Sequence, residues 1–83
     1  MAGREKPRLP DEIVLGSRFR LTPAEVRIAL GIARGEPLTE IADLHGITVQ
    51  TARTQLKSVF SKTRTNRQAQ LAVLLMEVAS SST

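Results

Sequence analysis

Signals that start and stop helices follow one another closely in this chain and leave room only for short helices. Thr22-Pro23-Ala24-Glu25 supplies a capping hydroxyl, a proline suited to the first helical position and a glutamate that completes a capping box. Gly35 and Gly46 can adopt the left-handed conformation that ends a helix. Thr48 can then cap the next helix. The sequence therefore predicts an all-α domain.

Four helices are expected, in a bundle-like arrangement. They run from Thr22 to Gly35, from Pro37 to about His45, from Thr48 to about Lys62, and from a second capping box at Thr65–Gln68 to about Ala79. Residues 1–18 carry two prolines and mixed charge and are interpreted as a flexible N-terminal arm or linker, with a turn of helix at Ile13–Leu15 as an open alternative. The domain would then cover residues 19–79, and residues 80–83 a frayed tail.

Composition limits the class of protein. A chain of 83 residues, 41% hydrophobic and 24% charged, suits one small globular domain. It has no cysteine for disulfides or metal binding, its single histidine lacks a partner ligand, and no carboxylate pair is clustered. No apolar run approaches the roughly 20 residues that span a bilayer. We expect a soluble, cytoplasmic protein without cofactor, metal, membrane contact or enzymatic activity.

The net charge of +4 is unevenly distributed along the chain. Residues 21–43 carry a net −2, whereas the stretch from 44 to 76 has no acidic residue and holds five cations. These cations are Arg53, Lys57, Lys62, Arg64 and Arg67. A basic segment favours an anionic partner, and the kind of partner depends on which other side chains lie on the same helix face.

The second and third helices have the internal pattern of a helix-turn-helix. Ala42 is small where the third helix would cross, Gly46 permits a tight turn, and Ile47 would fill it. At 100° per residue, one face of the third helix is apolar. The opposite face holds groups that hydrogen-bond with base edges: Gln50, Arg53, Thr54, Lys57 and Ser61. This pattern predicts a helix that reads the major groove of double-stranded DNA.

On these residues the chain resembles the LuxR/GerE-type helix-turn-helix domain of bacterial transcription regulators. The similarity covers Leu21–Leu75 and includes Leu21-Thr22-Pro23-x-Glu25, Gly35, Glu40-Ile41-Ala42, Gly46-Ile47, Val49-x-Thr51, Val59-Phe60-x-Lys62-Thr63 and Arg67-Gln68. The resemblance implies that Arg53, Thr54 and Lys57 face bases. It also implies that Thr48, Thr51, Gln55 and Arg67 hold phosphates.

Three positions depart from the family pattern. Pro37 stands where a capping residue is usual, His45 where leucine is usual, and Arg64 where glycine is common. Arg64 in particular requires another way to close the third helix. His45 is interpreted as a boundary side chain at a helix C-terminus, where a cation is favourable.

The fourth helix carries two apolar stripes. Leu71, Leu74, Leu75 and Val78 form one, and Ala69, Ala72, Val73 and Met76 the other. One stripe suffices for packing, and the resemblance implies that this helix is a dimer contact, with Ala69, Val73 and Met76 at the interface. A two-fold homodimer would match a DNA site with inverted half-sites.

Two other functions remain open from sequence. The first is the promoter-reading helix-turn-helix of a sigma factor, for which RNA polymerase would be a partner. The second is a helical protein-interaction module that acts on another regulator through the fourth helix. Single-stranded nucleic acid is disfavoured because the only aromatic residues, Phe19 and Phe60, are expected in the core.

Overall fold

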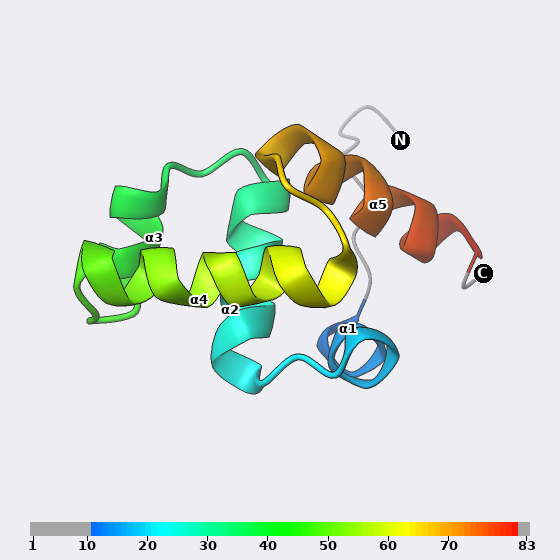
Figure 1. The fold of residues 1–83 in the computed structure, drawn as a ribbon, viewed down its shortest axis with the longest axis horizontal. Helices are drawn as coiled ribbons and strands as arrows, with labels where there is room; N and C mark the ends of the chain where they lie inside the picture. The colour runs from blue at the N-terminus through cyan, green and yellow to red at the C-terminus, as the bar shows by residue number, and fades with distance from the viewer. Residues whose placement is uncertain (1–10, 82–83) are drawn as a thin grey trace, which may run out of the picture.

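The computed structural model describes residues 11–81, and every regular element in that range is a helix (Figure 1). The predicted all-α class is confirmed. The flexible arm predicted at the N-terminus lies, for residues 1–10, outside the described residues. The elements are α1 (Glu12–Phe19), α2 (Pro23–Ala33), α3 (Leu38–Leu44), α4 (Val49–Thr63) and α5 (Gln68–Ser81).

Helix α1 corrects the prediction that residues 1–18 are an arm and that the bundle has four helices. Asp11 caps it by accepting a hydrogen bond from the Ile13 amide at 3.2 Å, and Arg20 ends it in the left-handed conformation. Leu15 is fully buried, which fixes α1 to the domain. The helix is only eight residues long and contains Gly16, so its apolar periodicity is too short to be distinguished from a single turn.

Helix α2 begins and ends as predicted. The Thr22 hydroxyl accepts from the Glu25 amide at 3.2 Å, and the Glu25 carboxylate accepts from the Thr22 amide at 2.9 Å, which is the expected capping box. Gly35 has a φ of 83° and donates to Ile32 O at 2.9 Å, which closes the C-terminus. Local signals along the chain therefore suffice to set both ends of this helix.

The connection between α3 and α4 forms the predicted tight turn. Gly46 has a φ of 67°, and the Ile47 amide donates back to Ala42 O at 3.0 Å. Ala42 is buried where α3 packs against α4, as its small size indicates. Pro37 occupies the N-cap of α3 without a side-chain hydrogen bond, and His45 is half-buried at its C-cap, as expected.

Helix α4 ends at a left-handed arginine. Arg64 has a φ of 59°, and the Thr65 amide donates to Phe60 O at 3.0 Å. The C-terminus of α4 therefore has the same left-handed cap as the helices that end at Gly35 and Gly46, with an arginine in place of the glycine. A side chain in this conformation costs roughly 1–2 kcal/mol.

We expect Arg64→Gly to raise the free energy of unfolding by about 1 kcal/mol, because glycine adopts the left-handed conformation without a steric penalty. Urea denaturation measures the change. Arg64→Ala is the control, since it removes the same charge and keeps the penalty. Equal stabilities of the two variants would contradict the explanation.

The start of α5 differs from the predicted capping box at Thr65–Gln68. The first helical hydrogen bond runs from the Leu71 amide to Arg67 O at 3.1 Å, which places the cap at Arg67. The side chain of Gln70 accepts from the Asn66 amide at 2.9 Å, while the Thr65 hydroxyl is hydrogen-bonded to Thr63 at 2.9 Å. The helix also continues through Ser81, beyond the predicted end at Ala79, so residues 80 and 81 are not a frayed tail.

The core lies around α2, which packs against α1, α3, α4 and α5. Its largest fully buried side chains are Leu15, Ile28, Ile41, Val59, Leu71 and Leu75. Gly31, inside α2, marks a close approach to α3. A Cβ added there would stand 2.7 Å from the Cδ1 atom of Ile41 on α3.

Candidate nucleic-acid interface

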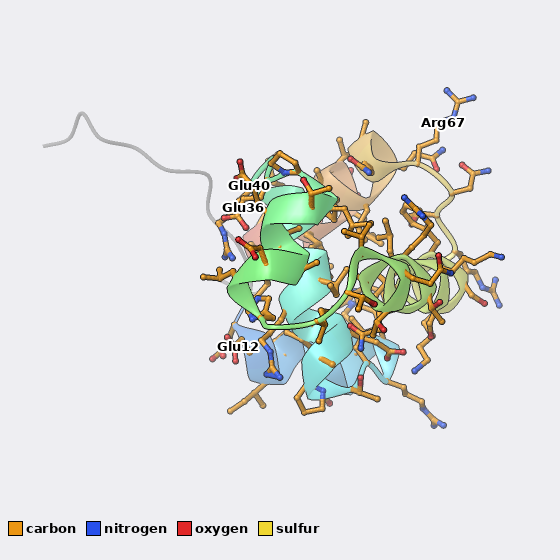
Figure 2. The ribbon with its side chains drawn as sticks, turned by 90° about the vertical axis from the view of Figure 1, so that its left-hand side faces the viewer. Glu12, Glu36, Glu40 and Arg67 are labelled. Carbon is orange, nitrogen blue, oxygen red and sulfur yellow. The ribbon has the colours of Figure 1, made fainter. Side chains whose placement is uncertain are left out.

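Helix α4 lies along one edge of the domain with one side packed and the other open to solvent (Figures 1 and 2). Its inner side is formed by residues that are buried or partly buried against the core: Val49, Ala52, Leu56, Val59 and Phe60. Thr48 caps the helix, and its first turn contains no acidic residue. The outward side therefore belongs to a helix of 15 residues that has no acidic side chain of its own in its first turn, where the partial positive charge of the helix N-terminus lies.

The side chains predicted to reach base edges are all exposed. They are Gln50, Arg53, Thr54, Lys57 and Ser61. Thr54 donates its hydroxyl hydrogen to Gln50 O at 3.1 Å, so in this rotamer it offers an outside group an acceptor oxygen and a methyl group. Arg53 and Lys57 have no ion-pair partner within residues 11–81. This face combines two available cations with neutral donors and acceptors.

Two of the predicted phosphate contacts lie at the N-terminus of α4. The Thr48 hydroxyl accepts from the Thr51 amide at 3.0 Å and donates to the Thr51 hydroxyl at 3.0 Å. The Thr51 hydroxyl hydrogen remains for an acceptor outside the helix. Both residues are exposed, so the helix cap and the predicted anion contact coincide.

Gln55 differs from the other predicted contacts because it is half-buried. It lines a hollow of about 60 Å³ together with Arg27, His45 and Ile47, where α2 meets the turn before α4. A phosphate contact by Gln55 would use only the outer part of its side chain. His45 lies beside Gln55 in this hollow.

Three carboxylates and one cation labelled in Figure 2 lie on different sides of the molecule. Arg67 extends from the side on which α4 lies, and it is exposed at the start of α5. Glu12, Glu36 and Glu40 lie on the opposite side.

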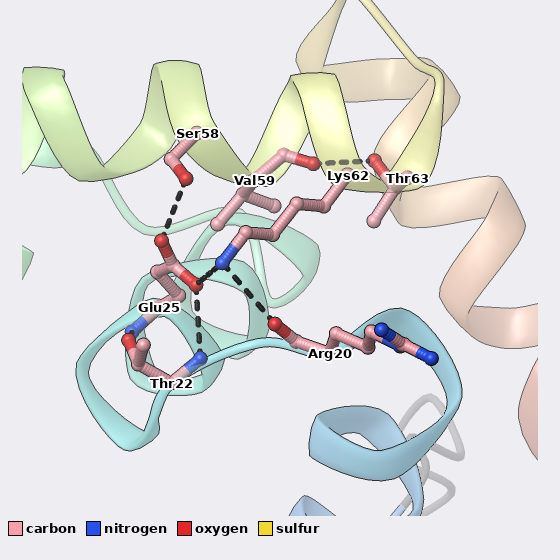
Figure 3. A network of polar contacts seen from close by, with 7 residues as sticks. All are labelled: Arg20, Thr22, Glu25, Ser58, Val59, Lys62 and Thr63. Carbon is pink, nitrogen blue, oxygen red and sulfur yellow. Dashed lines mark hydrogen bonds and ion pairs between the residues drawn. The ribbon is translucent and has the colours of Figure 1, made fainter.

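Lys62, one of the five cations of the acid-free stretch, makes its polar contacts within the protein (Figure 3). Its Nζ atom donates to Glu25 Oε1 at 2.7 Å and to Arg20 O at 3.1 Å. Ser58, one turn earlier on α4, donates to Glu25 Oε2 at 2.6 Å. Lys62 thus ties α4 to α2 and to the end of α1 instead of facing an external anion.

This network determines the ionisation of Glu25, whose exposure is only 8%. Burial by itself raises the pKa of Glu25, but hydrogen bonds from Lys62, from Ser58 and from the Thr22 amide outweigh burial and lower its pKa to about 2. Glu25 is therefore a buried carboxylate that stays charged. Sequence reasoning assigned it only to the capping box, because its partners on α4 lie 33 and 37 positions away.

The two apolar stripes of α5 have different environments. Leu71, Leu75 and Val78 are buried against the core, and Leu74 is half-buried. On the second stripe Ala69 is exposed, Val73 is 52% exposed and Met76 is 42% exposed. Val73 and Met76 line a shallow hollow together with Glu77 and Ser80. The residues predicted at a dimer interface therefore form an uncovered apolar face within the described residues.

Other kinds of site receive no support from the described part of the chain. Residues 11–81 contain no cluster of three or more His, Cys, Asp or Glu side chains able to hold a metal ion. In the same range no buried side-chain nitrogen or oxygen lacks a hydrogen-bond partner. None of the helices described is both long and apolar enough to cross a bilayer. Comparisons with protein-family models, curated proteins and solved structures find no match for this chain.

Proposed function

We propose that this domain binds double-stranded DNA in a sequence-specific manner as part of a transcription regulator, with α4 in the major groove. The observation that carries the proposal is the composition of the outward face of α4. This face holds exposed Arg53 and Lys57, which have no ion-pair partners among residues 11–81, together with exposed Gln50 and Thr54. Arginine, lysine and glutamine are the side chains that most often read base edges.

The dimensions of α4 suit this role. A helix of 15 residues is about 22 Å long, and a helix with its side chains fits the roughly 12 Å width of the major groove. Thr48 and Thr51 at one end of α4 and Arg67 beyond the other would bracket the groove and contact phosphates. Glu12 of α1 and Glu36 before α3 would lie on the side away from the duplex (Figure 2).

The experiment that tests the proposal is selection of duplexes from a random pool, followed by affinity measurements at several salt concentrations. Enrichment of one sequence, with affinity that falls steeply as salt rises, supports the proposal. An absence of duplex binding at low salt would contradict it and would favour a protein-interaction module. A selected sequence bound only together with RNA polymerase would favour the sigma-factor alternative.

We further propose that the apolar face of α5 joins two copies of the domain. Met76→Asp should weaken self-association at least about tenfold, because it places a charge in the centre of a desolvated contact. Leu44→Asp is the control, since Leu44 is 72% exposed on α3, away from this face. Sedimentation equilibrium measures the change, and equal dissociation constants for both variants would contradict a contact through α5.

A further inference from the structure

We propose that Glu25 is a positioning residue for DNA recognition, which fixes the rotation of α4 so that its outward side chains meet the base edges. The inference rests on the proposed function and concerns a residue that is remote from the outward face. Glu25 lies on the first turn of α2 and is almost completely buried. It can therefore influence DNA only through the helix that it holds.

The contacts of Glu25 constrain α4 at two points. Its Oε2 atom accepts from Ser58 at 2.6 Å and its Oε1 atom from Lys62 at 2.7 Å, and these two residues lie one helical turn apart (Figure 3). One anchor would still allow α4 to turn or slide, whereas two anchors on successive turns restrict both movements. The Thr22 amide holds the same carboxylate at 2.9 Å, so the anchor is itself fixed to the start of α2.

Apolar packing alone specifies this rotation less sharply. Contacts of Leu56 and Val59 with the core depend on buried area and have little directional preference. Hydrogen bonds depend strongly on distance and angle. The Glu25 contacts therefore add the directional component that the apolar interface lacks.

A small rotation would be sufficient to disturb base readout. At 100° per residue, Ser58 and Lys62 lie roughly 100–180° around the axis from Arg53 and Lys57. At about 6 Å from the axis, a rotation of about 20° moves a side-chain group by about 2 Å. A displacement of that size breaks hydrogen bonds to bases, which need a separation of about 3 Å. Attraction to phosphates falls off over about 10 Å and would be nearly unchanged.

The test compares affinities for two duplexes, one selected by the wild-type chain from a random pool and one scrambled sequence of equal composition. Glu25→Gln keeps the shape of the side chain and removes its charge. Glu40→Gln is the matched control, because Glu40 is exposed on α3 and its loss changes the net charge equally. Both substitutions make the chain more positive, so electrostatics alone would strengthen binding to either duplex.

We expect Glu25→Gln to bind the selected duplex at least about tenfold more weakly than Glu40→Gln does, a loss comparable to one mismatched base pair, while the two variants bind the scrambled duplex equally and with the same salt dependence. Glu40→Gln should keep the wild-type ratio of the two affinities. Partial unfolding would instead lower the affinities for both duplexes by the same factor, and that result would overturn the proposal. So would an unchanged ratio.

Ser58→Ala is the second variant, because it removes one of the two anchors and leaves the ion pair in place. It should lower the same affinity ratio by about threefold. If circular dichroism shows that Glu25→Gln is unfolded, the test rests on Ser58→Ala. An unchanged ratio of its affinities for the selected and scrambled duplexes then overturns the proposal. Failure of the wild-type chain to select any duplex would instead refute the proposed function, and the positioning role with it.

Discussion

Replacement of Arg53 by alanine is expected to weaken binding to the selected DNA site by about 1–3 kcal/mol, or roughly 5- to 150-fold. Arg53 is exposed on the outward face of α4 and has no ion-pair partner within residues 11–81, so its guanidinium is available for a bidentate contact with a guanine. The same availability predicts a small effect on folding. The free energy of unfolding should change by no more than about 0.5 kcal/mol.

The measurement is a titration of labelled duplexes that differ by one base pair at each position in turn. Arg53→Ala should lose discrimination at its own base pair, and Lys57→Ala should do so at a neighbouring one. Arg18→Ala is a suitable control, because it removes one exposed positive charge on α1 and should lower affinity slightly for all sequences. If the Arg53 and Lys57 variants both bind the site like the wild type, α4 does not read the groove.

Acid is expected to destabilise the domain mainly through Glu25. The pKa of Glu25 is about 2 in the folded state, against about 4.3 for an unfolded chain. The ionised carboxylate therefore stabilises the folded state when the pH is above the pKa of Glu25 in the unfolded chain. This contribution is lost as the pH falls from about 5 towards 2. The difference corresponds to about 2–3 kcal/mol, with the lower end favoured because the Lys62 side chain is 35% exposed.

Urea denaturation at a series of pH values measures this loss. Glu25→Gln should be less stable than the wild type by a similar amount at pH 7, and the gap between the two should close near pH 2. Glu40→Gln should run parallel to the wild type throughout, since its carboxylate is exposed. A constant difference between wild type and Glu25→Gln across this range would show that the carboxylate is not held by charged hydrogen bonds.

Sequence patterns identified the features whose causes are local. The capping box at Thr22 and Glu25 and the left-handed turns at Gly35 and Gly46 involve residues within five positions of each other. The exposed face of α4 was also predictable, because helical periodicity separates it from the buried face. At Thr65 the local rule was wrong, since its hydroxyl is hydrogen-bonded to Thr63 and Gln70 supplies the side chain near the cap instead.

The features that sequence reasoning missed depend on distant parts of the chain. Lys62 belongs by position to the basic stretch, and only the folded arrangement shows that it is bound to Glu25 and to Arg20 O. Similarly, α1 is held by Leu15 in the core, and eight residues with an internal glycine give too weak a periodicity to indicate this. Charge counted along the sequence therefore overestimated the cations available to a partner.

The close packing of α3 on α4 has a mechanical consequence. Ala42 and Ala52 are both almost completely inaccessible, and neither has rotatable side-chain atoms with which to absorb a change in the crossing of the two helices. The turn between them is closed by a backbone hydrogen bond from Ile47 to Ala42 O. The two helices should consequently move together as a rigid body relative to α2, and the Glu25 contacts restrict that movement. Any misfit with a duplex would then be accommodated by bending of the DNA, so that flexible base steps outside the contacted positions influence which sites are occupied.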